Sequence, residues 1–268
     1  MPGTTFIRRL VAVAALAAVG GFYASANAAE RPAQAAAPGP VKNVVLVHGL
    51  YADGSSWGKV IPLLQARGLH VTAVQNPTTS LEDDAAAVRR TLALQDGPTV
   101  LVGHSYGGMV ISEVGTDPKV AGLVYIAARA PDTGEDYPAL AKRFPAGPAS
   151  AGLQWQADGF GALSEQAFVQ DFAGDLPRSE ALGLYAVQQR VGKPVMQART
   201  TAAAWRQKPS WYAVSTQDRT IDPELQRFMA RRMKATTIEL PASHVSLLSR
   251  PAEVAELIIA ATQAGAKE

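Results

Sequence analysis

The sequence predicts an α/β protein with a mostly parallel sheet of about six strands, flanked by helices. Short apolar, β-branched segments alternate with amphipathic segments of helical spacing, which is typical of β-α repeats. The apolar segments are nearly continuous, as in strands buried on both faces. With 268 residues, of which 47% are hydrophobic, the chain can bury the core of one domain with an insertion. The six expected strands are residues 43–47, 71–74, 99–102, 120–127, 211–215 and 236–240.

Residues 1–28 are predicted to be a secretory signal peptide. Arg8 and Arg9 precede an apolar stretch, residues 10–18, that is too short to span a bilayer, and Ala26-Asn27-Ala28 forms an A-x-A cleavage site. We therefore expect export to the periplasm or the medium after cleavage near Ala28. The alternatives are an uncleaved membrane anchor and twin-arginine export, which the residues around the arginines fit poorly.

Charge and cysteine content narrow the classes of function. The formal net charge is +2, and because Arg8 and Arg9 belong to the predicted signal peptide, the mature chain is close to neutral. No basic run follows, so we expect no nucleic-acid partner and no stable membrane association. The chain has no cysteine, which excludes disulfides and thiolate chemistry.

The rest of the chain divides into a leader, a core and an insertion. Residues 29–40 are rich in alanine and proline and are expected to form a flexible leader. The core comprises residues 41–130 and 207–268. Between these two parts, in residues 131–206, the β-α alternation stops, so this segment is predicted to be a helical cap over the carboxyl ends of the strands, where open α/β sheets bind ligands. Its near-neutral, aromatic-containing sequence favours a small or medium, uncharged substrate.

Helices are expected between the strands and in the cap. Ser55 is the expected N-cap of the first core helix, and Asp222, followed by Pro223, the expected N-cap of the fourth. The expected core helices are residues 57–66, 81–94, 109–114, 223–233 and 251–261, and those of the cap are residues 164–172 and 179–189.

One motif indicates chemistry. Gly103-His104-Ser105-Tyr106-Gly107 matches G-x-S-x-G and lies between an expected strand and an expected helix. In such a turn the serine lies at a strained apex, and flanking glycines leave room for the crowded backbone. Ser105 is therefore the candidate nucleophile, the alternative being an idle serine in a glycine-rich turn.

A serine nucleophile needs a base to take its proton. Of the four histidines, His48 ends a strand, His70 begins one, and His104 is so close to Ser105 on the tight turn that we expect it only to pack. His244 follows the last expected strand, on the edge where parallel strands end together, and is the candidate base.

The base in turn needs an acid that orients it. Asp218, directly after the strand at 211–215, is the first candidate. Asp132, after the strand at 120–127, is the alternative acid, and Asp222 already has a role as an N-cap. The backbone N–H groups of Leu50 and Tyr106 are the expected oxyanion hole, because one follows the first strand and the other follows the nucleophile.

Three motifs carry a resemblance to a known family. Leu46-Val47-His48-Gly49, the residues G-H-S-Y-G-G from Gly103, and the residues S-H-V-S-L-L-S-R-P from Ser243 resemble the α/β-hydrolase superfamily, and more closely its branch of small esterases, plant methylesterases and hydroxynitrile lyases. The similarity covers residues 41–261. It implies an α/β-hydrolase fold and a triad of Ser105, Asp218 and His244, with no metal and no organic cofactor.

The resemblance also implies a function. We expect an exported serine hydrolase that cleaves carboxylic esters through an acyl-enzyme intermediate. The lyases of this branch usually have a lysine one or two positions after the histidine, where this chain has Val245 and Ser246, which argues against cyanohydrin cleavage. The alternatives are an acyltransferase, a peracid-forming enzyme, a lyase, or a silent binding protein. Acyl and alcohol specificity and oligomeric state do not follow from the sequence.

Overall fold

A single parallel sheet organises the chain. The structure is a computed structural model that describes residues 41–264, so the predicted signal peptide and leader lie outside the described residues. The sheet has six strands in the order β2-β1-β3-β4-β8-β9, and all neighbouring strands are parallel. This confirms the predicted sheet. The strands are β1 (Asn43–Val47), β2 (His70–Val74), β3 (Thr99–His104), β4 (Val120–Ile126), β8 (Ser210–Ser215) and β9 (Thr236–Leu240).

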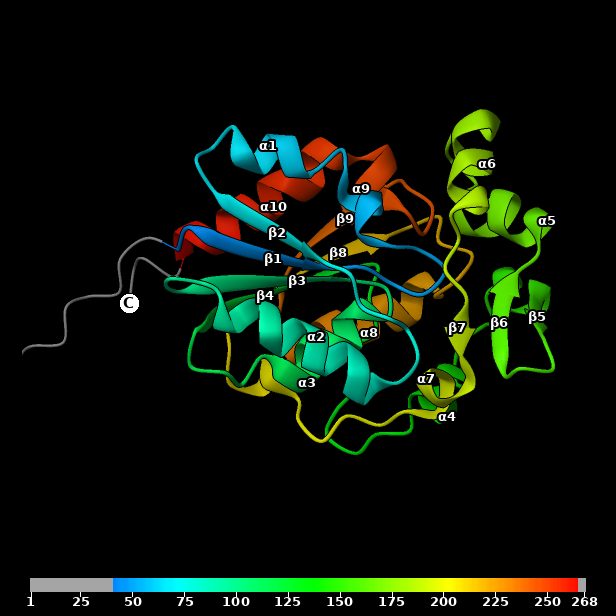
Figure 1. Cartoon of the computed structure of the whole chain (residues 1–268), viewed down its shortest axis with the longest axis horizontal. Helices are drawn as coiled ribbons and strands as arrows, with labels where there is room; N and C mark the ends of the chain where they lie inside the picture. Colours follow the sequence, from blue (N-terminus) through cyan, green and yellow to red (C-terminus); the bar gives the residue numbers. More distant parts are fainter. Residues whose placement is uncertain (1–40, 265–268) are drawn as a thin grey trace, which may run out of the picture. The chain divides into compact units, whose positions relative to one another are not determined.

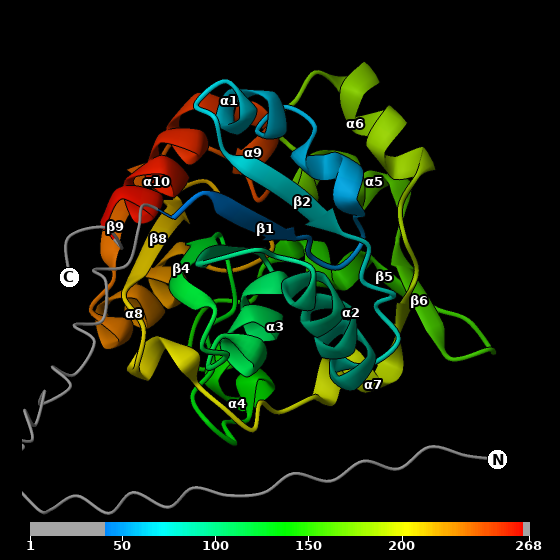
Figure 2. The same cartoon turned by 60° about the vertical axis from the view of Figure 1, so that its left-hand side comes forward.

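Helices cover both faces of the sheet. On one face lie α1 (Ile61–Gln65) and α10 (Pro251–Ala264), and on the other lie α2 (Leu81–Ala93), α3 (Gly107–Val114) and α8 (Pro223–Met233), as Figures 1 and 2 show. Every residue of β1 and β3 is buried. This burial from both sides explains why these strands are apolar without alternation.

The first helix differs from its expected form. A short 3₁₀ helix, Gly54–Trp57, comes first, and α1 begins only at Ile61, where Pro62 occupies the first turn. The expected cap, Ser55, was wrong: the carboxylate of Asp53 caps the 3₁₀ helix and accepts the Ser55 N–H at 2.8 Å, and α1 has no side-chain cap. Asp222 does cap α8, because its side chain accepts the N–H groups of Glu224 and Leu225.

The segment between β4 and β8 is only partly helical. It also contains a small antiparallel sheet of β5 (Leu153–Trp155), β6 (Phe160–Leu163) and β7 (Val191–Gly192). A tight turn at Asp158-Gly159, with Gly159 at φ +83°, joins the first two strands. Aspartate followed by glycine between two apolar segments is a hairpin signal, so this element was predictable.

Short helices make up the rest of this segment. They are α4 (Tyr137–Ala141), a 3₁₀ helix (Pro148–Gly152), α5 (Glu165–Ala167), a π-helical turn (Phe168–Phe172), α6 (Arg178–Ala186), α7 (Lys193–Gln197) and a 3₁₀ helix (Ala204–Arg206). Figure 1 shows α5, α6 and the small sheet on the side toward which the parallel strands point. None of the helices within residues 41–264 is both long and apolar enough to cross a membrane.

Candidate active site

Ser105 lies at the turn between β3 and α3, with a left-handed backbone of φ 54°. Its N–H donates to the carbonyl of Ile126 at 3.0 Å, and its own carbonyl accepts the N–H of Arg129 at 2.9 Å. These two bonds to the segment around the end of β4 hold the strained conformation. Strain of this kind persists only where the surrounding structure enforces it.

At two glycines of the motif, Gly103 and Gly107, there is no room for a Cβ atom. A Cβ on Gly103 would come within 2.5 Å of the carbonyl oxygen of Gly107. A Cβ on Gly107 would come within 2.4 Å of the carbonyl oxygen of Val47. Any larger residue at either position would force the turn or the neighbouring strand to move.

Three side chains from distant parts of the sequence meet at this turn. His244 Nε2 lies 2.8 Å from Ser105 Oγ, and His244 Nδ1 lies 2.6 Å from Asp218 Oδ2. Asp218 follows β8, and His244 precedes α9 (Ser246–Ser249) in the loop after β9. A carboxylate oxygen can only accept, so Nδ1 carries the imidazole proton and Nε2 is free to accept the serine proton.

Asp218 is held by a set of donors that orients its carboxylate. Oδ1 accepts the N–H groups of Thr220 at 2.7 Å and Ile221 at 3.0 Å. Oδ2 accepts the side-chain amide of Gln226 at 2.7 Å, while Gln226 Oε1 accepts the Ser215 N–H at 3.0 Å. Gln226 is completely buried. The sequence analysis missed it, although its place in the first turns of α8, next to the Asp218 loop, was a usable signal.

The other two acids do not reach His244. Asp132 forms an ion pair with Arg206, and this hydrogen bond lowers the pKa of Asp132 below its ordinary value. Asp222 serves as the N-cap of α8. Of the three aspartates considered from the sequence, the structure therefore brings only Asp218 to the imidazole.

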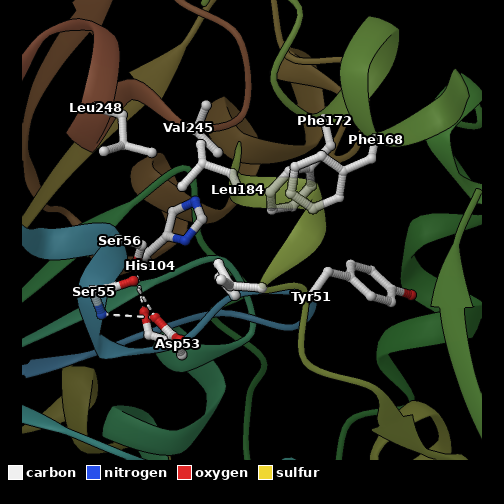
Figure 3. A pocket seen from close by; sticks show the side chains of 12 residues that line it. Tyr51, Asp53, Ser55, Ser56, His104, Phe168, Phe172, Leu184, Val245 and Leu248 are labelled. Carbon is white, nitrogen blue, oxygen red and sulfur yellow. Dashed lines mark hydrogen bonds between the residues drawn. The ribbon is translucent and has the colours of Figure 1, made fainter. Parts of the chain in front are cut away.

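His104 does more than pack. Its Nε2–H donates to the backbone carbonyl of His244 at 2.9 Å, and the two imidazole ring centroids are 4.9 Å apart. Burial lowers the pKa of His104 well below its ordinary value, so this ring is neutral. Figure 3 shows the ring between Val245 and Leu248 on one side and the loop of Asp53 on the other. His104 thus positions the backbone of the candidate base.

His48 holds the loop that carries Leu50. Its Nδ1–H donates to the Gly49 carbonyl at 2.9 Å, and its Nε2 accepts the Asn76 N–H at 3.2 Å. The loop lies tightly against Ser105, because a Cβ on Gly49 would come within 2.6 Å of Ser105 Cβ.

The two amides expected to form the oxyanion hole are both available. Within the described residues, neither the Leu50 N–H nor the Tyr106 N–H donates to a protein acceptor. Leu50 lies directly after the Gly49 contact with Ser105, and Tyr106 follows the nucleophile in the chain. Both donors are therefore free to bind a negatively charged oxygen beside Ser105.

The segment between β4 and β8 also contacts the histidine loop. Ser243, directly before His244, donates both its N–H, at 2.9 Å, and its hydroxyl to the carboxylate of Asp175. The Phe172 ring lies 5.1 Å from the His244 ring, measured between centroids. This segment therefore supports the candidate base as well as covering it.

Ser105 opens into a cavity of about 380 Å³. Leu50, Tyr51, Arg129 and Tyr137 also line it, and its volume suits a small organic ligand. Among residues 41–264, no group of three His, Cys, Asp or Glu side chains is arranged to hold a metal ion.

A second, much smaller pocket of about 20 Å³ lies beside His104 and is lined by Tyr51, Phe168 and Phe172, among others (Figure 3). Ser105 is not part of its lining. Its space is close to that of one water molecule and much less than that of the cavity beside Ser105.

Comparison with known proteins identifies the family. Residues 44–257 match the model of the alpha/beta hydrolase family, so the chain belongs to this family. The predicted resemblance and fold class are thereby confirmed.

The relatives found in these comparisons are named as esterases or hydrolases. The chain is 28% identical over 247 residues to a pyrethroid hydrolase of Sphingobium wenxiniae, covering 81% of this chain and 86% of that protein. It is 26% identical over 250 residues to methylesterase 8 of Arabidopsis thaliana, with 82% and 89% covered. The crystal structure of a pyrethroid hydrolase from Sphingobium faniae superposes with a TM-score of 0.71 at 25% identity, covering 85% of this chain and all of the other. These relatives support an esterase-type hydrolase.

Proposed function

We propose that this protein is a serine hydrolase that cleaves carboxylic esters through an acyl-enzyme intermediate. The observation that carries the proposal is the continuous chain of short hydrogen bonds from Asp218 Oδ2 through His244 to Ser105 Oγ. The first distance is 2.6 Å and the second 2.8 Å. Such an arrangement has one principal use, which is to remove a proton from a hydroxyl at the moment it attacks.

The proposed reaction proceeds in two halves. His244 Nε2 takes the proton of Ser105 as Oγ attacks the ester carbonyl, and the amides of Leu50 and Tyr106 stabilise the oxyanion. The carbon–oxygen bond to the alcohol breaks, and the alcohol leaves with the proton from His244. Water then attacks the acyl-serine, giving its proton to His244, and the acid is released as Ser105 regains its proton.

Cavity volume and relatives support a small or medium ester as the substrate. The cavity of about 380 Å³ admits both an acyl and an alcohol part of modest size. The pyrethroid hydrolase and methylesterase relatives are named for ester-bearing molecules. The near-neutral segment between β4 and β8 favours an uncharged ester. Export after cleavage near Ala28 remains part of the proposal and is tested by the N-terminus of the secreted protein.

Replacement of the nucleophile tests the proposal. Ser105→Ala should reduce hydrolysis of short acyl esters to near background and abolish labelling by a fluorophosphonate probe. The control is Ser179→Ala, a change to an exposed serine in α6, which should keep both activities. Undiminished hydrolysis by the Ser105 variant would refute the assignment. Products formed with alcohol or peroxide present distinguish hydrolysis from acyl transfer and peracid formation.

A further inference from the structure

Arg129 lies beside the nucleophile and lines the same cavity. Its backbone N–H donates to the Ser105 carbonyl, which places it firmly against the turn. Its guanidinium carbon lies 5.0 Å from the Tyr137 ring centroid and 5.9 Å from that of Tyr106. Two aromatic faces therefore hold the cation, which is half-buried, at a defined position in the cavity wall.

Arg129 has no acidic partner in the part of the chain that the structure describes. No carboxylate oxygen among residues 41–264 lies within 4.0 Å of its nitrogens, and its Nε is buried without a hydrogen-bond acceptor. Arg206 and Arg232, by contrast, pair with Asp132 and Glu135. A partly buried guanidinium without an acceptor loses hydration that nothing in the protein replaces. The position therefore suits an arginine whose acceptor arrives with a ligand.

Two hydroxyl groups accompany this cation. Tyr51 and Tyr137 line the cavity, and the structure gives neither hydroxyl a hydrogen bond to another described residue. Burial raises the pKa of both phenols, that of Tyr137 to about 12, so both are protonated donors at neutral pH. In Figure 3 the Tyr51 hydroxyl points away from His104 and its small pocket. The cavity thus offers a guanidinium and two O–H donors together.

The charges on the cavity wall are not balanced. Arg129 and the exposed Lys142 line it on the positive side, and Asp222 lines it on the negative side. The Asp222 carboxylate already accepts the N–H groups of Glu224 and Leu225 as the cap of α8. Asp218 is engaged with His244 and three further donors. Neither carboxylate of these two aspartates is therefore left to pair with Arg129, and a carboxylate on a ligand fits the free donors.

We propose that the substrate carries a carboxylate in addition to the ester, as in a half-ester of a short dicarboxylic acid, and that Arg129 binds this carboxylate. The planar guanidinium can donate two parallel hydrogen bonds to a carboxylate, which makes arginine well suited to this recognition. Ser105 and Arg129 line the same cavity, so one ligand can contact both residues. This inference rests on the proposed function. It replaces the expected uncharged substrate, which was based on residues 131–206 and left out Arg129.

A pair of isosteric esters tests the inference. Monomethyl glutarate carries the carboxylate, and methyl 4-carbamoylbutanoate has a neutral amide of the same shape in its place. The wild-type protein should cleave the charged ester with at least tenfold higher kcat/KM, measured by methanol release. Arg129→Met should reduce this ratio to near one, chiefly by raising KM for the charged ester, and Arg129→Lys should retain part of it.

A second arginine provides the control. Arg143 packs over the Phe228 ring at 5.6 Å and is not part of the cavity lining, so Arg143→Met should keep the wild-type ratio. A wild-type ratio near one would overturn the inference, and so would an equal loss on both esters in Arg129→Met. In either case, activity on the neutral ester and fluorophosphonate labelling of Ser105 would leave the proposed function standing. Absence of both would refute the proposed function itself.

Discussion

Substitution of the three candidate aspartates separates the one that orients His244 from the two that do not. Asp218→Asn should lower kcat/KM for ester hydrolysis by about 10⁴-fold, the usual effect when the orienting acid of a serine triad becomes an amide. The asparagine oxygen would stay with the N–H groups of Thr220 and Ile221. Its NH₂ would then face His244 Nδ1, now 2.6 Å from a carboxylate oxygen, and the imidazole would adopt the wrong tautomer.

Gln226 strengthens this expectation. Its side-chain amide donates to Asp218 Oδ2 at 2.7 Å and to the Ile221 carbonyl at 2.9 Å. The NH₂ group of Asp218→Asn would therefore meet a second donor as well as the imidazole. This conflict should also cost stability, about 1–3 kcal/mol for a buried polar group without a partner.

The two other aspartates serve as matched controls. Asp132→Asn removes an ion pair with Arg206, whose side chain is 57% exposed, so the expected cost is at most about 1 kcal/mol. Asp222→Asn keeps a good N-cap residue and should change the free energy of unfolding by less than about 0.5 kcal/mol. Steady-state kinetics on a short acyl ester and urea unfolding give both quantities. An active Asp218→Asn beside an inactive Asp132→Asn would refute the assignment.

Two further substitutions probe buried groups near the site. Gln226→Leu leaves the Ser215 N–H and the Ile221 carbonyl unpaired, so it should cost about 2–5 kcal/mol in urea unfolding. It should also lower kcat/KM for ester hydrolysis, because the Asp218 carboxylate loses a donor that orients it toward His244, and an unchanged kcat/KM would contradict this role. Burial raises the pKa of Asp84 to about 6, so the folded state keeps a proton that the unfolded state has released. Between about pH 4 and 6 the wild-type protein should therefore lose up to about 3 kcal/mol of stability as pH rises, with no further loss from this group above that window. Asp84→Asn should remove this dependence in urea unfolding at pH 5 and pH 8, and an unchanged dependence would contradict the reasoning.

Local patterns in the sequence were sufficient to predict the strands of the parallel sheet. β1 has the expected bounds, because a buried parallel strand leaves a nearly continuous apolar segment. β9 also has the expected bounds, although it is largely exposed and its β-branched residues, Thr236, Thr237 and Ile238, are the local signal. The helix α8 was also predictable, since Asp222 and Pro223 mark its start through local hydrogen bonding and a fixed φ. The start of α1 was not, because its N-cap, Val60, forms no side-chain cap hydrogen bond, and the good cap residues Asp53 and Ser55 belong to the preceding 3₁₀ helix.

Contacts between segments that are distant in the sequence could not be predicted from local sequence patterns. Nothing near Asp175 in the sequence indicates that its carboxylate binds Ser243. The hydrogen bond from His104 to the His244 carbonyl could not be predicted either, because its acceptor lies 140 positions further along the chain. Both contacts depend on the packing of segments that are far apart in the sequence, which periodicity and capping signals do not describe.

Arg129 contacts Ser105 through its backbone and lines the cavity through its side chain. The chain leaves β4 through Ala127, whose φ of 44° turns the backbone so that the Arg129 N–H reaches the Ser105 carbonyl. The same turn places the guanidinium between Tyr106 and Tyr137, facing the cavity. One residue thus supports the strained turn at Ser105 through its backbone and faces the cavity through its side chain. Exchanging the side chain can therefore alter which ester binds while the backbone bond that holds Ser105 is kept.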